Sequence, residues 1–140
     1  MARTRRRYNP DVVSASLEAI ARRYGIELLV HFGSTVTGAT HAGSDLDIGV
    51  LFERTPVPFD DLVALSADLQ ALQPEREVDV AVINYADPLF LKKITESCVV
   101  VYGSEQRLAR LKLYAFKRYV DHRRFLDLER EYVRRYVAGT

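Results

Sequence analysis

Four short aliphatic runs constrain the fold of this chain more than any other feature of its sequence. They occupy residues 26–32, 45–52, 77–84 and 98–102. Segments with apolar residues at helical spacing lie before, between and after them, so helix and strand alternate along the chain. This order predicts an α+β, layered α/β arrangement, with one mixed sheet of about four strands covered by helices.

The predicted helices follow from local signals. The first starts at Asn9-Pro10, where proline suits the first helical position, and ends at Gly25. The residues after Gly33-Ser34 predict a tight turn and one short helix. Three later helices are predicted over residues 59–72, over residues 88–96 and from Ser104 nearly to the C-terminus. No repeat or linker divides the chain, so we predict a single domain over residues 1–140.

Bulk composition narrows the class of protein. The chain is 48% hydrophobic and 28% charged, which is typical of a globular protein. No apolar run approaches the ~18 residues of a membrane span, and the N-terminus lacks the apolar centre of a signal peptide. The single cysteine, Cys98, is expected to be a small packed side chain in a reducing compartment. We therefore expect a cytoplasmic protein without a membrane partner.

Charge is distributed unevenly, although the net formal charge is only +1. Residues 1–103 carry 10 basic and 14 acidic side chains, whereas residues 104–140 carry 10 basic and 5 acidic ones. The C-terminal segment is therefore basic relative to the rest. Two interpretations stay open: a solvated helix face, or a surface that binds nucleotides, nucleic acid or an acidic protein.

Three aspartates interrupt two otherwise aliphatic strands. Strand alternation puts Asp45 and Asp47 on the face opposite to the aliphatic side chains of residues 45–52, and it does the same for Asp79 in residues 77–84. Neighbouring strands lie about 4.8 Å apart, so the three carboxylates could converge if these strands pair. The alternative is that each aspartate lies at a strand end or on a solvent face. Because aspartate is disfavoured inside strands, we favour convergence.

Converging carboxylates imply a bound cation. They repel one another and raise each other's pKa unless a positive charge offsets them. All-oxygen ligation suits Mg²⁺, which commonly takes one or two protein carboxylates and completes its shell with phosphate and water. Two such ions about 3.5–4 Å apart form the clamp used in phosphoryl and nucleotidyl transfer.

Gly33-Ser34 is a candidate phosphate site. The pair ends a predicted strand and precedes a predicted helix start. Glycine permits close approach of the backbone, serine supplies a hydroxyl, and N–H groups at a helix N-terminus favour an anion. A plain turn is the alternative. No P-loop or G-x-G-x-x-G motif is present to take this role.

These features together resemble a known family. Gly33-Ser34, ten intervening residues, then Asp45-Leu46-Asp47, with Asp79 on a later strand, resembles the signature of the DNA polymerase β-like nucleotidyltransferase superfamily. The short length and the ending "ESCVVVYGSEQRLARLKLYAFKRYVDHRRFLDL" are similar to the minimal nucleotidyltransferases, the MNT half of HEPN–MNT toxin–antitoxin pairs. The resemblance extends from Val12 to about Leu128. It implies the nucleotidyltransferase fold, with a catalytic core at 8–103 and a C-terminal helical extension at 104–138.

The resemblance also implies residue roles. Asp45 and Asp47 would ligate two Mg²⁺ ions, and Asp79 would complete the metal site and help to activate an acceptor hydroxyl. Gly33 and Ser34 would hold the β- and γ-phosphates of a nucleoside triphosphate. In HEPN–MNT pairs the acceptor is a tyrosine of the HEPN toxin, an RNase-like protein that loses activity when AMP is attached. The implied function is therefore an antitoxin that transfers AMP, with a HEPN toxin and a nucleoside triphosphate as partners and no stable nucleic-acid partner.

One position departs from the family pattern. Relatives often read "GSxARG", whereas this chain reads "GSTVTG", with Thr37 in place of the basic residue. Threonine cannot offset triphosphate charge, so either a cation from elsewhere, such as the basic C-terminal helix, replaces it or triphosphate affinity is reduced. The departure motivates an alternative function, a non-catalytic antitoxin that masks the toxin with its C-terminal helix. A nucleotidyltransferase for small molecules ranks last, because the chain has little room for an acceptor domain.

Aromatic and basic residues are interleaved on the last predicted helix. Such surfaces are enriched at protein interfaces. Tyr114 and Tyr119 either pack against the body or contact a partner, whereas we predict partner contact for Tyr132 and Tyr136. His31, in an aliphatic strand, is predicted to be a packed residue.

Overall fold

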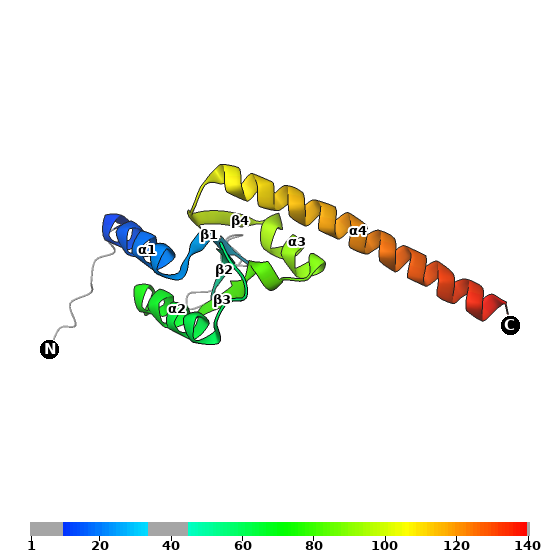
Figure 1. The fold of residues 1–140 in the computed structure, drawn as a ribbon, viewed down its shortest axis with the longest axis horizontal. Helices are drawn as coiled ribbons and strands as arrows, with labels where there is room; N and C mark the ends of the chain where they lie inside the picture. Colours follow the sequence, from blue (N-terminus) through cyan, green and yellow to red (C-terminus); the bar gives the residue numbers. More distant parts are fainter. Residues whose placement is uncertain (1–9, 34–44, 140) are drawn as a thin grey trace.

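The computed structural model describes residues 10–33 and 45–139. In this part of the chain the elements follow one another in the predicted order (Figure 1). They are α1 (Pro10–Tyr24), β1 (Ile26–Phe32), β2 (Leu46–Phe52), α2 (Phe59–Leu72), β3 (Val78–Val82), η1 (Ile83–Tyr85), α3 (Pro88–Glu96), β4 (Cys98–Tyr102) and α4 (Glu105–Ala138). The α+β prediction is confirmed. The short helix predicted after Gly33-Ser34 lies outside the described residues.

The four strands form one mixed sheet in the order β3-β2-β1-β4. Strand β1 is antiparallel to both of its neighbours, β2 and β4, whereas β2 and β3 are parallel. A parallel pair requires a crossover connection, and α2 supplies it between β2 and β3. The two strands that carry the predicted aspartates are therefore adjacent and run in the same direction.

Helices cover both faces of the sheet, and each face has its own apolar core (Figure 1). Helices α1 and α2 cover one face, where strand residues such as Ile48 and Val50 meet Leu65 and Leu69 of α2. Helix α3, η1 and the start of α4 cover the other face, where the core contains Leu28, Val30, Phe32, Leu51, Ile83, Leu91, Ile94, Leu108, Leu111 and Ala115. Because Ile48 and Val50 face α2, strand alternation turns Asp47 toward α3.

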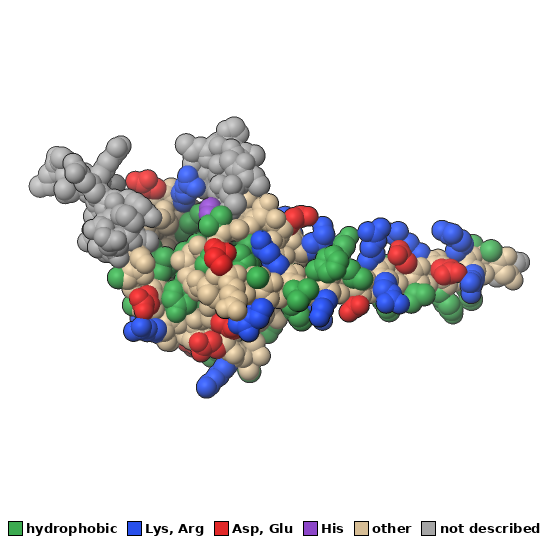
Figure 2. All heavy atoms as spheres, turned by 90° about the horizontal axis from the view of Figure 1, so that it is seen from above, with side chains coloured by type: hydrophobic (Ala, Val, Ile, Leu, Met, Phe, Trp, Pro, Cys, Tyr) green, Lys and Arg blue, Asp and Glu red, His purple; other side chains and the backbone are tan. Residues whose placement is uncertain are grey.

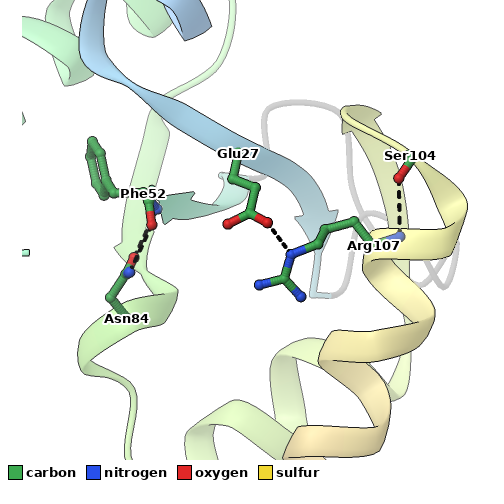
Figure 3. A network of polar contacts seen from close by, with 5 residues as sticks. All are labelled: Glu27, Phe52, Asn84, Ser104 and Arg107. Atoms are coloured by element: carbon green, nitrogen blue, oxygen red, sulfur yellow. Dashed lines mark hydrogen bonds and ion pairs between the residues drawn. The ribbon is translucent and has the colours of Figure 1, made fainter. Parts of the chain in front are cut away.

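The third strand is shorter than the sequence predicts. Residues 83 and 84, expected at its end, belong to the short helix η1. The side-chain amide of Asn84 donates to the carbonyl of Phe52, and its oxygen accepts from the amide N–H of Phe52 (Figure 3). The Asn84 side chain thus makes the hydrogen bonds to Phe52 that the backbone of a longer β3 would make. The neighbouring Ile83 is buried in the core.

Helix α4 is anchored at its start and projects from the body at its end (Figure 1). The hydroxyl of Ser104 caps it by accepting from the N–H of Arg107, and the Arg107 guanidinium donates to Glu27 of β1 (Figure 3). Leu108, Leu111 and Ala115 then lie in the core. From Arg123 to Ala138, every side chain except that of Leu126 is exposed. Across the described residues, the structure has no helix with the length and apolarity of a membrane span.

Candidate active site

The register of the sheet brings two of the predicted aspartates together. In the parallel pair of strands, Asp47 of β2 lies opposite Asp79 of β3. In the antiparallel pair, Asp47 lies opposite Phe32, the last residue of β1. Gly33 therefore leaves β1 directly beside the Asp47 carboxylate. Three of the predicted site residues thus meet at one end of the sheet.

The backbone of Gly33 passes very close to the Asp47 carboxylate. Its backbone has a φ of 87°, in the left-handed region that favours glycine. A Cβ atom added at Gly33 would overlap Oδ2 of Asp47 and would lie 3.2 Å from its Cγ. Any other residue at this position would therefore strain the backbone and displace the Asp47 carboxylate. Glycine lets the backbone pass the carboxylate in its observed position.

A polar side chain from α2 sets the start of β3. The side-chain oxygen of Gln70 accepts from the N–H of Val78 at 2.9 Å, and its amide nitrogen donates to the carbonyls of Gln73 and Arg76. These contacts hold the loop that connects α2 to β3. The loop in turn places Asp79, the next residue after Val78, opposite Asp47.

Asp47 and Asp79 line a cleft of about 430 Å³ between the end of the sheet and α3. The rest of its lining consists of Phe32, Gly33, Val80, Ala81, Phe90 and Lys93. The ring of Phe90 meets that of Phe32 edge to face, with centroids 6.1 Å apart. Sequence reasoning missed Phe90 and Lys93. Their spacing of three residues in α3 shows that they share a helix side, but only the fold shows that this side meets the carboxylates.

The electrostatics of the cleft centre on Asp47. Burial raises the pKa of its carboxyl above the ordinary value, and the negative charges of Asp79 and then Asp45 raise it further. His31 and Lys93 act in the opposite direction. Ionisation of Asp47 is therefore less favourable in the metal-free protein than in water. A cation bound between the carboxylates would offset this repulsion.

The donor set fits a hard cation that is completed by substrate. Among the described residues, no three His, Cys, Asp or Glu side chains form a complete metal cluster. Asp47 and Asp79 nevertheless offer carboxylate oxygens in one cleft, and Mg²⁺ needs only one or two protein carboxylates when phosphate and water supply the rest. Asp45 lies exposed in front of β2, close enough for its charge to act on Asp47.

The other predicted residues are not among the described residues that line the cleft. Ser34 and Thr37 fall outside the described residues. His31 is half-buried in β1, and burial lowers its pKa. It lines a second cavity, on the α1 and α2 side of the sheet, together with Ser14, Leu17, Leu46, Ile48, Leu69, Leu72, Gln73, Arg76, Val78 and Val101. The described lining of that cavity contains no carboxylate, so it does not offer the ligands that the cleft offers.

A protein-family model matches the part of the chain that contains the sheet. Residues 15–107 match the family model described as "Polymerase beta, Nucleotidyltransferase". This span contains the whole sheet and every described residue that lines the carboxylate cleft. A search of curated protein sequences gives no significant match.

Several solved structures share the fold. One is a crystal structure of a toxin–antitoxin with AMP-PNP, with a TM-score of 0.65 at 20% identity over 89% of this chain and 98% of that chain. A second is the tri-AMPylated Shewanella oneidensis HEPN toxin in complex with MNT antitoxin, with a TM-score of 0.60 at 17% identity over 93% and 99%. A third, described as a minimal nucleotidyltransferase, has a TM-score of 0.51 at 25% identity over 67% and 97%.

Proposed function

This chain belongs to the polymerase beta nucleotidyltransferase family, and from that membership we propose that it is a Mg²⁺-dependent enzyme that transfers AMP from ATP to a tyrosine of a HEPN-family toxin. The observation that carries the proposal is the pairing of Asp47 with Asp79 in one cleft, beside the positive-φ backbone of Gly33. Structurally similar chains come from toxin–antitoxin complexes, one with AMP-PNP and one with an AMPylated toxin, which supports this choice of donor and acceptor.

The proposed reaction assigns a task to each site residue. Mg²⁺ held by Asp47 and Asp79, with Asp45 as a third carboxylate, would supply Lewis-acid stabilisation of charge on the reacting phosphate. Gly33 leaves the space in which the β- and γ-phosphates approach the backbone, and Ser34 follows it as a hydroxyl donor. The tyrosine oxygen forms a bond to the α-phosphorus while the bond to the β-phosphate oxygen breaks and pyrophosphate leaves. Asp79, exposed at the cleft, receives the tyrosine proton.

The distal part of α4 is the proposed docking surface for the toxin. Phe125, Leu128, Tyr132 and Tyr136 follow one another at spacings of three and four residues, so they share one side of the helix. Each is at least 64% exposed, and the rings of Tyr132 and Tyr136 stack with centroids 6.5 Å apart. Along this projecting part of α4, basic side chains are interspersed with apolar ones (Figure 2). Aromatic residues among arginines are the composition that protein interfaces favour.

The two parts of the chain have different proposed roles. Residues 8–103 carry the chemistry, and residues 104–138 carry the contact with the toxin. The boundary is functional rather than a break in packing, because the first turns of α4 belong to the core.

A second function uses the same docking surface without chemistry. The exposed side of α4 and the lack of a basic residue in "GSTVTG" favour an antitoxin that masks the toxin by binding alone. The two functions differ in what they require of the cleft. A variant with Asp47→Asn and Asp79→Asn keeps its protection of cells against the toxin if masking is sufficient, and loses it if AMP transfer is required.

The direct test is incubation of the protein with its HEPN toxin, Mg²⁺ and ATP labelled at the α-phosphate. We expect label on the toxin, located at a tyrosine by mass spectrometry, and no label with the Asp47→Asn variant. Asp60→Asn is the matched control, because Asp60 is an exposed aspartate in the first turn of α2, away from the cleft. Wild-type protein that transfers no nucleotide under any divalent metal would overturn the proposal.

A further inference from the structure

The cleft needs a positive side chain if it is to hold a polyphosphate. Its two carboxylates are negative, and residues 33–47, which lead from Gly33 to Asp47, contain no lysine or arginine. Divalent ions offset part of the charge of a triphosphate, but proteins usually add a cationic side chain that donates hydrogen bonds to the phosphate oxygens. The described lining of the cleft contains one basic residue, Lys93.

Two adjacent lysines of α3 have different surroundings. The Lys92 ammonium donates to Glu96 at 3.0 Å and lies 4.9 Å from the ring centroid of Tyr119 in α4. Lys93 is exposed and turns to the cleft, where its charge acts on Asp47. Within the described residues, Lys93 forms no ion pair and no side-chain hydrogen bond. Lys92 is therefore paired with Glu96 at the surface, whereas no described residue accepts a hydrogen bond from the ammonium of Lys93.

The helix that carries Lys93 is held firmly against the sheet. Its N-terminus is capped by Asp87, whose carboxylate accepts from the N–H of Phe90 at 2.8 Å. Leu91 and Ile94, which flank the two lysines, are fully buried in the core that α3 shares with β1 and α4. The backbone of Lys93 is thus placed by packing, and only its flexible side chain has to adapt to a ligand.

We propose that Lys93 binds the phosphate oxygens of the nucleoside triphosphate, as the cation that the segment after Gly33 does not provide. This inference rests on the proposed function, since it takes a nucleoside triphosphate as the ligand of the cleft. A lysine ammonium is a compact point charge on a long flexible stem, which suits contact with a polyphosphate between metal-binding carboxylates and a helix.

The test is the binding of two probes, ATP and inorganic tripolyphosphate, each with Mg²⁺, measured by calorimetry. The variants are Lys93→Ala, Lys93→Arg and, as the matched control, Lys92→Ala, with circular dichroism to establish that each one folds. We expect Lys93→Ala to weaken the binding of both probes by about ten- to a hundredfold. Lys93→Arg should retain most of the affinity because it keeps the charge, and Lys92→Ala should bind as the wild type does.

Three results would overturn the inference. They are equal affinities for the two alanine variants, a loss confined to ATP with tripolyphosphate unchanged, and a wild type that binds neither probe. The proposed function is separated from the inference by the labelling of the toxin. If Lys93→Ala loses polyphosphate binding but the wild type labels no toxin, phosphate binding by Lys93 is supported and AMP transfer to the toxin is rejected. If the wild type labels the toxin and Lys93→Ala binds both probes as Lys92→Ala does, AMP transfer is supported and the role of Lys93 is rejected.

Discussion

Gly33 lies so close to the carboxylate of Asp47 that a methyl group at position 33 would overlap Oδ2. The last residue of β1, Phe32, pairs with Asp47 across the sheet, and the chain turns at Gly33 with a positive φ. This contact joins the predicted phosphate site to the predicted metal site.

Gly33→Ala is expected to damage both stability and the site. The left-handed backbone costs a non-glycine residue about 1–3 kcal/mol, and the added methyl group has to displace the Asp47 carboxylate. Gly25→Ala is the control, because Gly25 also has a positive φ but its added Cβ would only touch Glu53 at 3.9 Å. Chemical denaturation and toxin labelling should show a stability loss in both variants and a loss of labelling in Gly33→Ala alone.

Asp47→Asn is expected to stabilise the metal-free protein at neutral pH while it abolishes transfer. Burial and the charges of Asp79 and Asp45 raise the pKa of Asp47 in the folded state, so its ionisation opposes folding. The gain in the free energy of unfolding should reach up to about 1 kcal/mol, because water at the cleft screens part of the repulsion.

The sign of this effect sets its pH dependence. Below the ordinary aspartate pKa of about 4, position 47 is uncharged in both folded and unfolded wild type, and the two proteins should differ little. The difference should grow as pH rises through the raised pKa of the folded state and then stay constant. Thermal melts of both proteins from pH 3.5 to 8 measure it. A variant that is less stable than the wild type at pH 7 contradicts the prediction.

Mg²⁺ is expected to stabilise the wild type through the paired carboxylates. At ten times its dissociation constant, the ion should raise the melting temperature by about 4 °C. A variant with both Asp47→Asn and Asp79→Asn should show no such rise, since both carboxylates that line the cleft are removed. Asp60→Asn should respond as the wild type does. Differential scanning fluorimetry with and without a chelator measures the shift, and equal shifts in all three proteins would exclude a metal site at the cleft.

Removal of two exposed aromatic rings from α4 is expected to weaken binding to the toxin without reducing the stability of the fold. Tyr132 and Tyr136 are both 70% exposed, so replacing both with alanine should change the free energy of unfolding by less than about 0.5 kcal/mol. Binding to the HEPN toxin should weaken at least about tenfold if these rings are central to the interface. Phe59→Ala, which removes an exposed ring from α2, serves as the control. Unchanged affinity, measured by calorimetry, would place the toxin elsewhere.

The ion pair between Arg107 and Glu27 is expected to contribute to stability. Both side chains are partly buried, and the pair joins the start of α4 to β1. Arg107→Ala leaves the Glu27 carboxylate without this donor, which should cost about 1–2 kcal/mol. Arg135→Ala breaks the exposed pair with Glu131 and should cost less than about 0.5 kcal/mol. Urea denaturation compares the two, and equal costs would show that burial adds nothing at the Arg107 pair.

Much of the fold could be predicted because its signals are local. The aliphatic runs and the helical spacings identify the described helices and strands, since one face of each element has to be apolar to pack. The end of β3 is the clearest difference. It depends on the side chain of Asn84 meeting Phe52, and these two residues come from separate parts of the chain. No local pattern contains that contact.

The candidate site also has features that local sequence patterns predict and features that only tertiary contacts determine. Strand alternation was sufficient to put Asp47 and Asp79 each on the non-aliphatic face of its strand, and the spacing of Gly33-Ser34 from Asp45 was sufficient to indicate the family. The register that sets Asp47 against Asp79, the contact that requires glycine at position 33, and the approach of Lys93 to the cleft were decided by the tertiary structure. Each of these joins segments that are distant along the chain. Periodicity determines which way a side chain faces, but only the packing of whole elements determines what it meets.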